Sequence, residues 1–281
     1  RPDFPVGRPR YRMRVVTAWV VILAVGVPIG LLTRRLWQEW TTLMAEEHAA
    51  TANAVVGYPN IYPAVSQADR PQPWSRVEGD EMFVWSGWKK GEGHGWFKLV
   101  SGDCDPAAIG DPIGRDIALS IDFPAVEIGG GRIWDRIPDD ADVVALAVGK
   151  MSCAYPRAVL SKVLIVNDEV EGTPILLHDD PFTTQDGEVA AFDPRLDGRR
   201  ITMGSSGFTV AGRHVLYDRG TESLWIDQGA GLTAFSGKHK GRTLPLVKRL
   251  APTPWREWEA DHPSARLLVG SLDRHRALPS E

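Results

Sequence analysis

Residues 15–32, VVTAWVVILAVGVPIGLL, carry no charged side chain and separate a basic tail from a long polar body. Eighteen residues in a helix reach about 27 Å, which is close to the hydrocarbon thickness of a bilayer. No later stretch has this apolar length. Apolar and aromatic residues continue at helical spacing to about residue 50. We therefore expect a basic tail over residues 1–14 and one membrane-spanning helix with an interfacial extension over residues 15–50.

Two other interpretations of the apolar run are a cleaved signal peptide and a buried helix of a soluble protein. A signal peptide has a shorter apolar core and ends in small residues at a cleavage site. Here the run passes directly into Arg34 and Arg35. The tail before the run is richer in Arg, so the positive-inside bias predicts a cytoplasmic N-terminus and an extracytoplasmic body. We expect a single-pass protein of the inner (cytoplasmic) membrane with a periplasmic main domain.

The anchor also carries features that favour contact with other membrane helices. Gly26 and Gly30 are spaced as small-xxx-small, which allows a second helix to approach closely. Trp19, Trp37 and Trp40 are candidates for contacts with lipid or with a partner subunit. We therefore expect other transmembrane subunits and the lipid bilayer as partners.

Composition excludes one class of partner and leaves the cysteines open. The formal net charge of −4 argues against nucleic acid, which favours a basic surface. Cys104 and Cys153 could form one disulfide in an oxidising compartment, or they could be two separate core residues. Both alternatives stay open at this point.

The remainder of the chain follows a β pattern. Residues 51–80 are proline-rich and predict an extended linker, residues 81–270 a β-rich domain, and residues 271–281 a C-terminal tail. Asp186-Gly187 and Asp197-Gly198 are hairpin signals, and residues 253–262 are the clear helical candidate. We expect a mainly β, sandwich-like or barrel-like domain with few short helices. The runs that favour strands are residues 82–88, 96–100, 117–121, 143–148, 175–177, 189–192, 208–217, 223–226 and 266–269.

A series of motifs between Cys153 and Gly270 resembles a known family. They are Ala154-Tyr155-Pro156, Val166-Asn167-Asp168, Phe192-Asp193-Pro194-Arg195, Asp197-Gly198-Arg199, Met203-Gly204-Ser205-Ser206-Gly207, Tyr217-Asp218-Arg219-Gly220-Thr221-Glu222-Ser223-Leu224-Trp225, Trp255, Trp258 and His262-Pro263. In this order they are similar to the bacterial family known as domain of unknown function 3179 (DUF3179). The segment from Tyr217 to Trp225 is the most specific part. The resemblance implies a fold neighbourhood and no assigned activity.

The chain departs from that family at one point. Many members carry a Cys-Pro-x-Cys-Gly segment before the Phe-Asp-x-Arg stretch. The equivalent stretch here begins His178-Asp179-Asp180-Pro181 and contains no cysteine. A thiolate site cannot form without thiols, so this chain lacks such a site. Together with the apolar run at residues 15–32, we interpret the chain as a membrane-anchored form of the family without the Cys-Pro-x-Cys segment.

Two polar segments are candidates for chemistry. His178 and Asp180 could share a divalent metal, but Asp179-Asp180-Pro181 equally spells a turn, which we favour. The stretch Gly204-Ser205-Ser206-Gly207 lacks the spacing of a nucleophile elbow and predicts a tight turn between strands.

The set formed by Asp218, Arg219 and Glu222 has two interpretations. An Arg–carboxylate bond would hold the turn between two strands. The functional alternative is an anion pocket built on Arg219 with Trp225 beside it. The structural role is favoured.

The sequence shows no catalytic constellation and predicts no cofactor. We expect a non-enzymatic accessory or structural subunit of a larger membrane complex, for example a photosynthetic or respiratory one, with its β-rich domain capping the extracytoplasmic side. The alternatives are a tethered domain that binds a metal or small anion through His178, Asp180 and Arg219, and an enzyme whose site no motif reveals.

Overall fold

The structure is a computed structural model that describes residues 71–89, 93–117, 120–122, 124–130, 134, 137–182 and 187–271. These residues all belong to one unit of the chain, Ala52–Glu281. The predicted tail, the anchor, residues 51–70 of the linker and residues 272–281 lie outside the described residues, as do Trp19, Gly26, Gly30, Trp37 and Trp40. Within the described ranges, no helix has the length and apolar character needed to cross a membrane.

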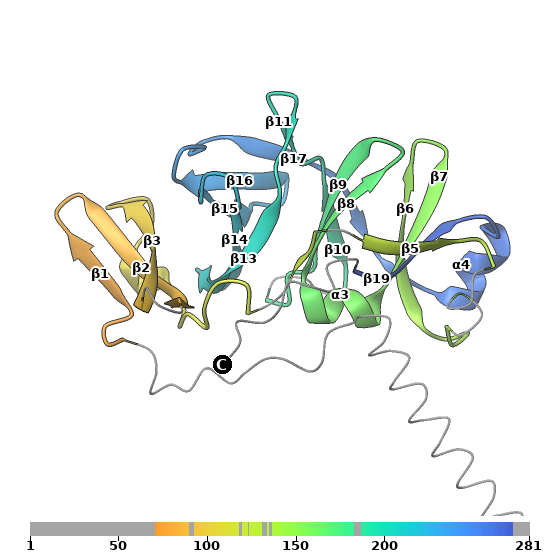
Figure 1. The fold of residues 1–281 in the computed structure, drawn as a ribbon, viewed down its shortest axis with the longest axis horizontal. Helices are drawn as coiled ribbons and strands as arrows, with labels where there is room; N and C mark the ends of the chain where they lie inside the picture. The colour runs from red at the N-terminus through yellow and green to blue at the C-terminus, as the bar shows by residue number, and fades with distance from the viewer. Residues whose placement is uncertain are drawn as a thin grey trace, which may run out of the picture. The chain divides into compact units, whose positions relative to one another are not determined.

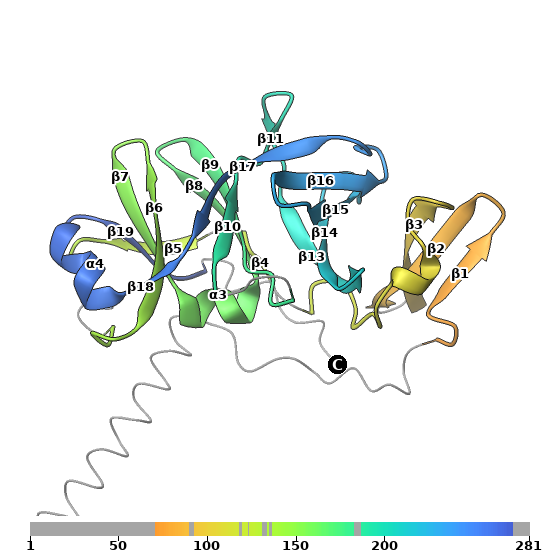
Figure 2. The same ribbon diagram turned by 180° about the vertical axis from the view of Figure 1, so that it is seen from behind.

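The predicted mainly β architecture is confirmed, because the described residues form many short strands and two short α-helices (Figures 1 and 2). The helices are α3 (Arg157–Val163) and α4 (Trp255–Asp261), with a 3₁₀ turn at Pro106–Ala108. The strands are β1 (Ser75–Glu78), β2 (Glu81–Lys89), β3 (Gly93–Val100), β4 (Ser120–Ile121), β5 (Pro124–Ile128), β6 (Asp142–Val148), β7 (Met151–Pro156), β8 (Ile165–Val170), β9 (Thr173–His178), β10 (Val189–Phe192), β11 (Arg195–Leu196), β12 (Arg199–Arg200), β13 (Met203–Val210), β14 (Arg213–Asp218), β15 (Leu224–Asp227), β16 (Gly231–Ser236), β17 (Thr243–Leu250), β18 (Pro252–Pro254) and β19 (Arg266–Ser271).

The strands form a central nine-stranded sheet and three smaller sheets. The central sheet has the order β13-β14-β15-β16-β17-β10-β9-β8-β4 and is antiparallel except where β4 pairs with β8. A three-stranded sheet has the order β1-β2-β3, and a five-stranded sheet has the order β18-β6-β7-β19-β5. Strands β11 and β12 form a separate hairpin, which stands at the top of the molecule in Figure 1.

The central sheet curls until its two ends meet, which gives it a barrel-like form. Strand β13 at one end contacts β8 and β4 at the other. The buried side chain of Asn167 on β8 makes the connection in place of a neighbouring strand. Its Nδ2 donates to the carbonyl of Met203 at 2.8 Å, and its Oδ1 accepts from the amide of Met203 at 2.9 Å. Because an amide side chain has the same donor and acceptor as a peptide unit, it satisfies the edge of β13.

Alternation of side chains along the strands gives the central sheet an inner and an outer face. The inner face forms a core that includes Ile165, Leu176, Phe192, Met203, Leu216, Trp225 and Leu244. The outer face of β8–β10 packs against α3 and the five-stranded sheet, and the outer face of β13–β15 packs against the three-stranded sheet. The other face of the five-stranded sheet is covered by α4 through Trp255 and Trp258.

Several predicted elements agree with the structure and others do not. The predicted helix at 253–262 is confirmed as α4, which begins directly after Pro254. The predicted run at 208–217 is two strands, because Ala211 and Gly212 adopt positive φ and turn the chain back. The tight turn predicted at 204–207 was wrong, since these residues lie inside β13. Helix α3 was missed because its seven residues are too short to establish a helical period.

The disulfide that Cys104 and Cys153 could form is not present, and both thiols are free. Cys104 packs at the edge of the core beneath the three-stranded sheet, whereas Cys153 lies in the core between the central and five-stranded sheets. The two residues therefore serve different cores. Burial raises the pKa of the Cys104 thiol to about 11, so this thiol stays protonated near neutral pH.

Candidate functional site

The segment from Tyr217 to Trp225 forms the end of β14, a tight turn and the start of β15. Asp218 is buried and holds this turn together. Its carboxylate accepts from the amide of Thr221 at 2.6 Å and from the indole Nε1 of Trp225 at 3.2 Å. The next carboxylate, Glu222, sits at a φ of +57°, which closes the turn and directs the chain into β15.

Arg219 joins this turn to a segment about a hundred residues earlier in the chain. Its Nη atoms donate to Asp116 at 3.1 and 3.3 Å and to the hydroxyl of Ser120 at 2.7 Å. Its Nε lies 3.1 Å from Asp122 in an ion pair without the alignment of a hydrogen bond. The hydroxyl of Tyr217 also donates to Asp116, at 2.5 Å. We call Asp116, Ser120, Asp122, Tyr217 and Arg219 the Arg219 network.

These contacts differ from the pairing expected from sequence. The carboxylates that face Arg219 are Asp116 and Asp122, whereas Asp218 serves its own turn and Glu222 pairs with Arg115 at 2.5 Å. Sequence reasoning missed Asp116 and Asp122, since no local pattern relates them to Arg219. Trp225 directs its Nε1 to Asp218, so the structure does not place it with Arg219 around an anion pocket.

His178 and Asp180, the candidate metal ligands, each contact other protein groups. Asp180 accepts from the backbone amides of Phe182 at 2.9 Å and of His214 at 3.3 Å. Asp179 between them pairs with Arg157 at 2.5 Å. Within the described residues, no three His, Cys, Asp or Glu side chains are grouped closely enough to hold a metal ion.

His178 instead begins a chain of three side chains inside the central sheet. Its Nε2 lies 3.0 Å from Nδ1 of His214, and Nε2 of His214 lies 2.8 Å from the hydroxyl of Ser205. All three side chains are buried, and Nδ1 of His178 has no hydrogen-bond partner among the described residues. We call Ser205, His214 and His178 the histidine chain. Sequence reasoning missed Ser205 and His214 because the stretch around Ser205 was interpreted as a turn.

Burial keeps both histidines of this chain uncharged near neutral pH. Desolvation lowers the pKa of His178 to about 4 and that of His214 to about 3. The neighbouring His178 lowers the pKa of His214 further, whereas the carboxylate of Asp180 opposes both shifts. A Ser–His–His order resembles the arrangement in which a histidine takes a proton from a serine nucleophile. Here the serine has no exposed surface.

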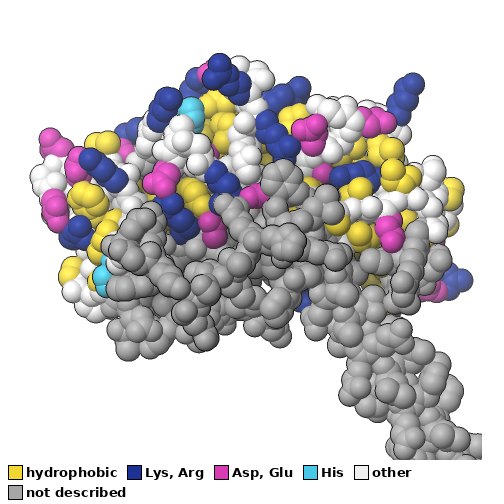
Figure 3. Space-filling view, in the orientation of Figure 1, with side chains coloured by type: hydrophobic (Ala, Val, Ile, Leu, Met, Phe, Trp, Pro, Cys, Tyr) yellow, Lys and Arg dark blue, Asp and Glu magenta, His cyan; other side chains and the backbone are white. Residues whose placement is uncertain are grey.

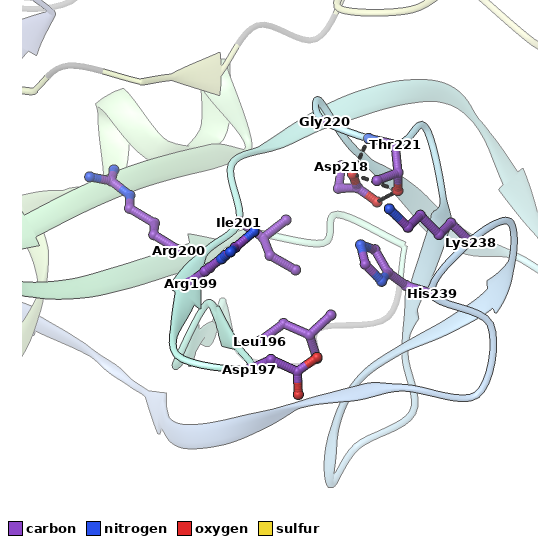
Figure 4. A pocket seen from close by; sticks show the side chains of 10 residues that line it. All are labelled: Leu196, Asp197, Arg199, Arg200, Ile201, Asp218, Gly220, Thr221, Lys238 and His239. Carbon is purple, nitrogen blue, oxygen red and sulfur yellow. Dashed lines mark hydrogen bonds between the residues drawn. The ribbon is translucent and has the colours of Figure 1, made fainter.

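An open pocket of about 610 Å³ lies beside the most specific segment. Its lining comes from the β11–β12 hairpin and Ile201, from the turn after β14, and from Lys238 and His239 after β16 (Figure 4). Figure 4 shows Arg199 lying beside Ile201, with Arg200 turned away from the other side chains. Lys and Arg side chains gather around the hairpin at the top of the molecule in Figure 3.

Comparison with known proteins gives one match. The family model described as "Protein of unknown function (DUF3179)" matches residues 120–278. No curated protein and no solved structure matches the chain. The matched part contains the central sheet and its closure through Asn167, the histidine chain and the pocket, whereas the three-stranded sheet and Asp116 precede it. Since the match covers more than half of the 281 residues, the chain belongs to the DUF3179 family.

Proposed function

We propose that the chain is an accessory subunit of a larger membrane complex and carries out no reaction of its own. The apolar residues 15–32 anchor it in the cytoplasmic membrane, with the N-terminus in the cytoplasm. The β-rich body lies on the extracytoplasmic side and acts as a scaffold. Gly26, Gly30 and the neighbouring tryptophans are the contacts that we expect with other transmembrane subunits and lipid.

One observation carries this proposal: the polar side chains of the most specific segment are used to hold the fold. Asp218 fixes the turn, Arg219 connects it to Asp116 and Asp122, and Glu222 pairs with Arg115. These bonds tie the central sheet to the segment that precedes it in the chain. Rigid connections of this kind favour a body whose contribution to a complex is shape and buried area.

The main alternative, a metal or anion site on His178, Asp180 and Arg219, has less support. His178 faces His214, Asp180 accepts from two backbone amides, and Arg219 faces two carboxylates. An anion at Arg219 would have to displace an existing ion pair. Elemental analysis of the purified protein tests the metal alternative, since a stoichiometric metal would favour it over the scaffold.

The test of the proposal is purification from native membranes in a mild detergent through an affinity tag. We expect the chain to migrate in a particle well above its own mass of 30.9 kDa, with partner subunits that mass spectrometry identifies. Photosynthetic and respiratory subunits are the first to look for. A lone species of the chain's own mass would contradict the proposal. Deleting residues 1–50 should release the body from the membrane and from the particle.

A serine hydrolase is a second candidate, and the 2.8 Å contact between Ser205 and His214 is the observation that favours it. Its test is labelling of the full chain with a fluorophosphonate probe, with Ser205→Ala as the control. Labelling that disappears in Ser205→Ala would favour the hydrolase. If the chain is a scaffold, the probe leaves the wild type unlabelled and Ser205→Ala enters the particle as the wild type does.

A further inference from the structure

We propose that the pocket beside the β11–β12 hairpin binds a small organic anion. Its anionic head, a phosphate or carboxylate, would be held by Arg199 and Lys238, and its apolar part would lie against Leu196 and Ile201. The proposal goes beyond the scaffold function and does not depend on it. It concerns a different place from the Arg219 network.

The charges around the pocket are unbalanced in favour of an anion. Within the described part of the chain, neither Arg199 nor Lys238 has an ion-pair partner, and both are exposed. The carboxylates that also line the pocket are already engaged. Asp197 pairs with Arg242 at 2.6 and 3.1 Å, and Asp218 accepts from Thr221 and Trp225. Thus neither cation is in an ion pair with a described residue, and the two outnumber Asp218, the one carboxylate of the lining that is itself outside an ion pair.

Arg200, the third Lys or Arg side chain of the pocket lining, shows the contrast. Arg200 donates to Glu169 at 3.1 Å and to the carbonyl of Asn167 at 2.9 Å, so its guanidinium is committed to the edge of the central sheet. Figure 4 shows it turned away from the other side chains of the pocket. Adjacent residues of the same hairpin therefore have separate roles, with Arg200 fixing the hairpin and Arg199 left available to a ligand.

The pocket also has apolar surface, which an inorganic ion would not use. Leu196, on β11 of the hairpin, is buried against the inner core of the central sheet, and Ile201 packs at the edge of that core. The ring of His239 lies beside that of Trp225, with ring centroids 6.0 Å apart and ring planes tilted by 45°. A volume of about 610 Å³ lies within the range of small-molecule sites and far exceeds that of a phosphate ion. Cations beside an apolar wall fit an organic anion.

The frame of the pocket is held in place before any ligand arrives. Asp197 and Gly198 have φ values of +51° and +74°, which fit the tight turn of the hairpin. The turn after β14 is held by Asp218 and joined to the turn after β16 through Ser223. The Ser223 hydroxyl lies 2.7 Å from that of Thr221 and accepts from the amide of His239 at 3.1 Å. A preformed site loses less entropy on binding.

Isothermal titration of the full chain in a non-ionic detergent tests the proposal with three probes. Phenyl phosphate offers an anion and a ring, inorganic phosphate only the anion, and phenol only the ring. We expect phenyl phosphate to bind about tenfold more tightly than inorganic phosphate, a difference that one buried ring can supply. Phenol should give no saturable binding. Equal affinity for the two phosphates, or no saturable binding of phenyl phosphate, would overturn the proposal.

Two variants and a matched control locate the site. Arg199→Gln and Lys238→Gln should each weaken phenyl phosphate binding about tenfold, because each removes a charged donor. Lys248→Gln changes an exposed lysine on β17 that does not line the pocket, so it should bind as the wild type does. If Lys238→Gln and Lys248→Gln bind equally well, the proposal fails. The scaffold function is tested separately, since it predicts that all three variants enter the membrane particle.

Discussion

The Arg219 network and the histidine chain lie on opposite faces of the same strand, β14, and are buried by different means. Tyr217 on the outer face belongs to a network in which charged groups face partners of opposite charge. His214 on the inner face belongs to a chain in which both histidines are uncharged near neutral pH. A charge near the surface is retained when its partners are close, whereas a base in a closed interior is neutral.

The difference also determines what each cluster does for the fold. The Arg219 network connects segments that are far apart in the chain and keeps some contact with solvent. The histidine chain connects β9, β13 and β14 across the interior of one sheet. We therefore expect acid to destabilise the fold through the histidine chain. Removal of one member of the Arg219 network should destabilise the fold because it leaves the other members without a partner.

The largest loss of folding stability should come from lowering the pH. Both histidines have a pKa well below the value of about 6.5 in the unfolded chain, so the unfolded state binds more protons as the pH falls below 6.5. The stability that these groups contribute is present above pH 6.5 and is lost as the pH falls toward 4 and 3. We expect a loss on the order of 3–4 kcal/mol between pH 7 and pH 5, measured by urea denaturation of the full chain in detergent.

A double variant, His178→Leu with His214→Leu, separates this effect from other titrations. Both side chains lie on the inner face, because His178 alternates with Leu176 on β9 and His214 with Leu216 on β14. The variant should lose most of the dependence on pH between 7 and 5, whatever its stability at pH 7. A variant with the same pH dependence as the wild type would contradict the assignment. His178→Leu alone should remove about half of the effect.

The second largest loss of stability should come from removing the cation of the Arg219 network. Arg219→Ala leaves Asp116, Asp122 and Ser120 without their shared donor and should destabilise the fold by about 2–3 kcal/mol. The effect lies below that of a fully enclosed pair, because 19% of the Arg219 side chain and 28% of the Asp116 side chain are exposed. The shift in urea midpoint measures it. Arg195→Ala, which breaks an exposed pair with Asp193, is the control and should leave the midpoint unchanged.

How well each cluster could be predicted from sequence follows from how it is built. The turn from Tyr217 to Trp225 could be recognised as important because its residues are contiguous. Its partners at Asp116 and Asp122 could not be, because they depend on which strands become neighbours when the central sheet closes. The same holds for Asn167, whose bond to Met203 exists only when β8 reaches β13.

The histidine chain was hidden by a single local error. Glycines on both sides of Ser205 and Ser206 predicted a turn, but the segment is a strand with a register shift between Ser205 and Thr209. Gly207 has a φ of +82°, and a Cβ there would lie 2.0 Å from the carbonyl oxygen of Gly114. The glycine thus allows close approach of two backbones within a bulged strand. The alternating strands were predictable, whereas the bulge that follows Ser205 in β13 was not.

The third largest loss of stability should come from breaking the contact between Ser205 and His214. Ser205→Ala leaves Nε2 of His214 without its partner in a closed interior and should cost about 1–2 kcal/mol at pH 7. Ser206→Ala is the matched control, because Ser206 is equally buried but bonds the carbonyl of Val215 at 2.7 Å. Both variants should lose stability. Only Ser205→Ala should also change the pH dependence between 7 and 5, and equal pH profiles for the two variants would contradict the chain of contacts.

The smallest loss of stability should come from changing Glu222, which pairs with Arg115 outside the Arg219 network. Glu222→Gln removes the charge that faces Arg115, but 53% of the Glu222 side chain is exposed, so water screens the pair. The guanidinium of Arg115 also keeps its positions over Phe97 at 4.2 Å and Tyr217 at 4.8 Å. We expect a loss below about 1 kcal/mol, reduced further by salt. If Glu222→Gln shifted the urea midpoint as far as Arg219→Ala, the exposed pair would share the role of the buried one, and the contrast between partners of different burial would fail.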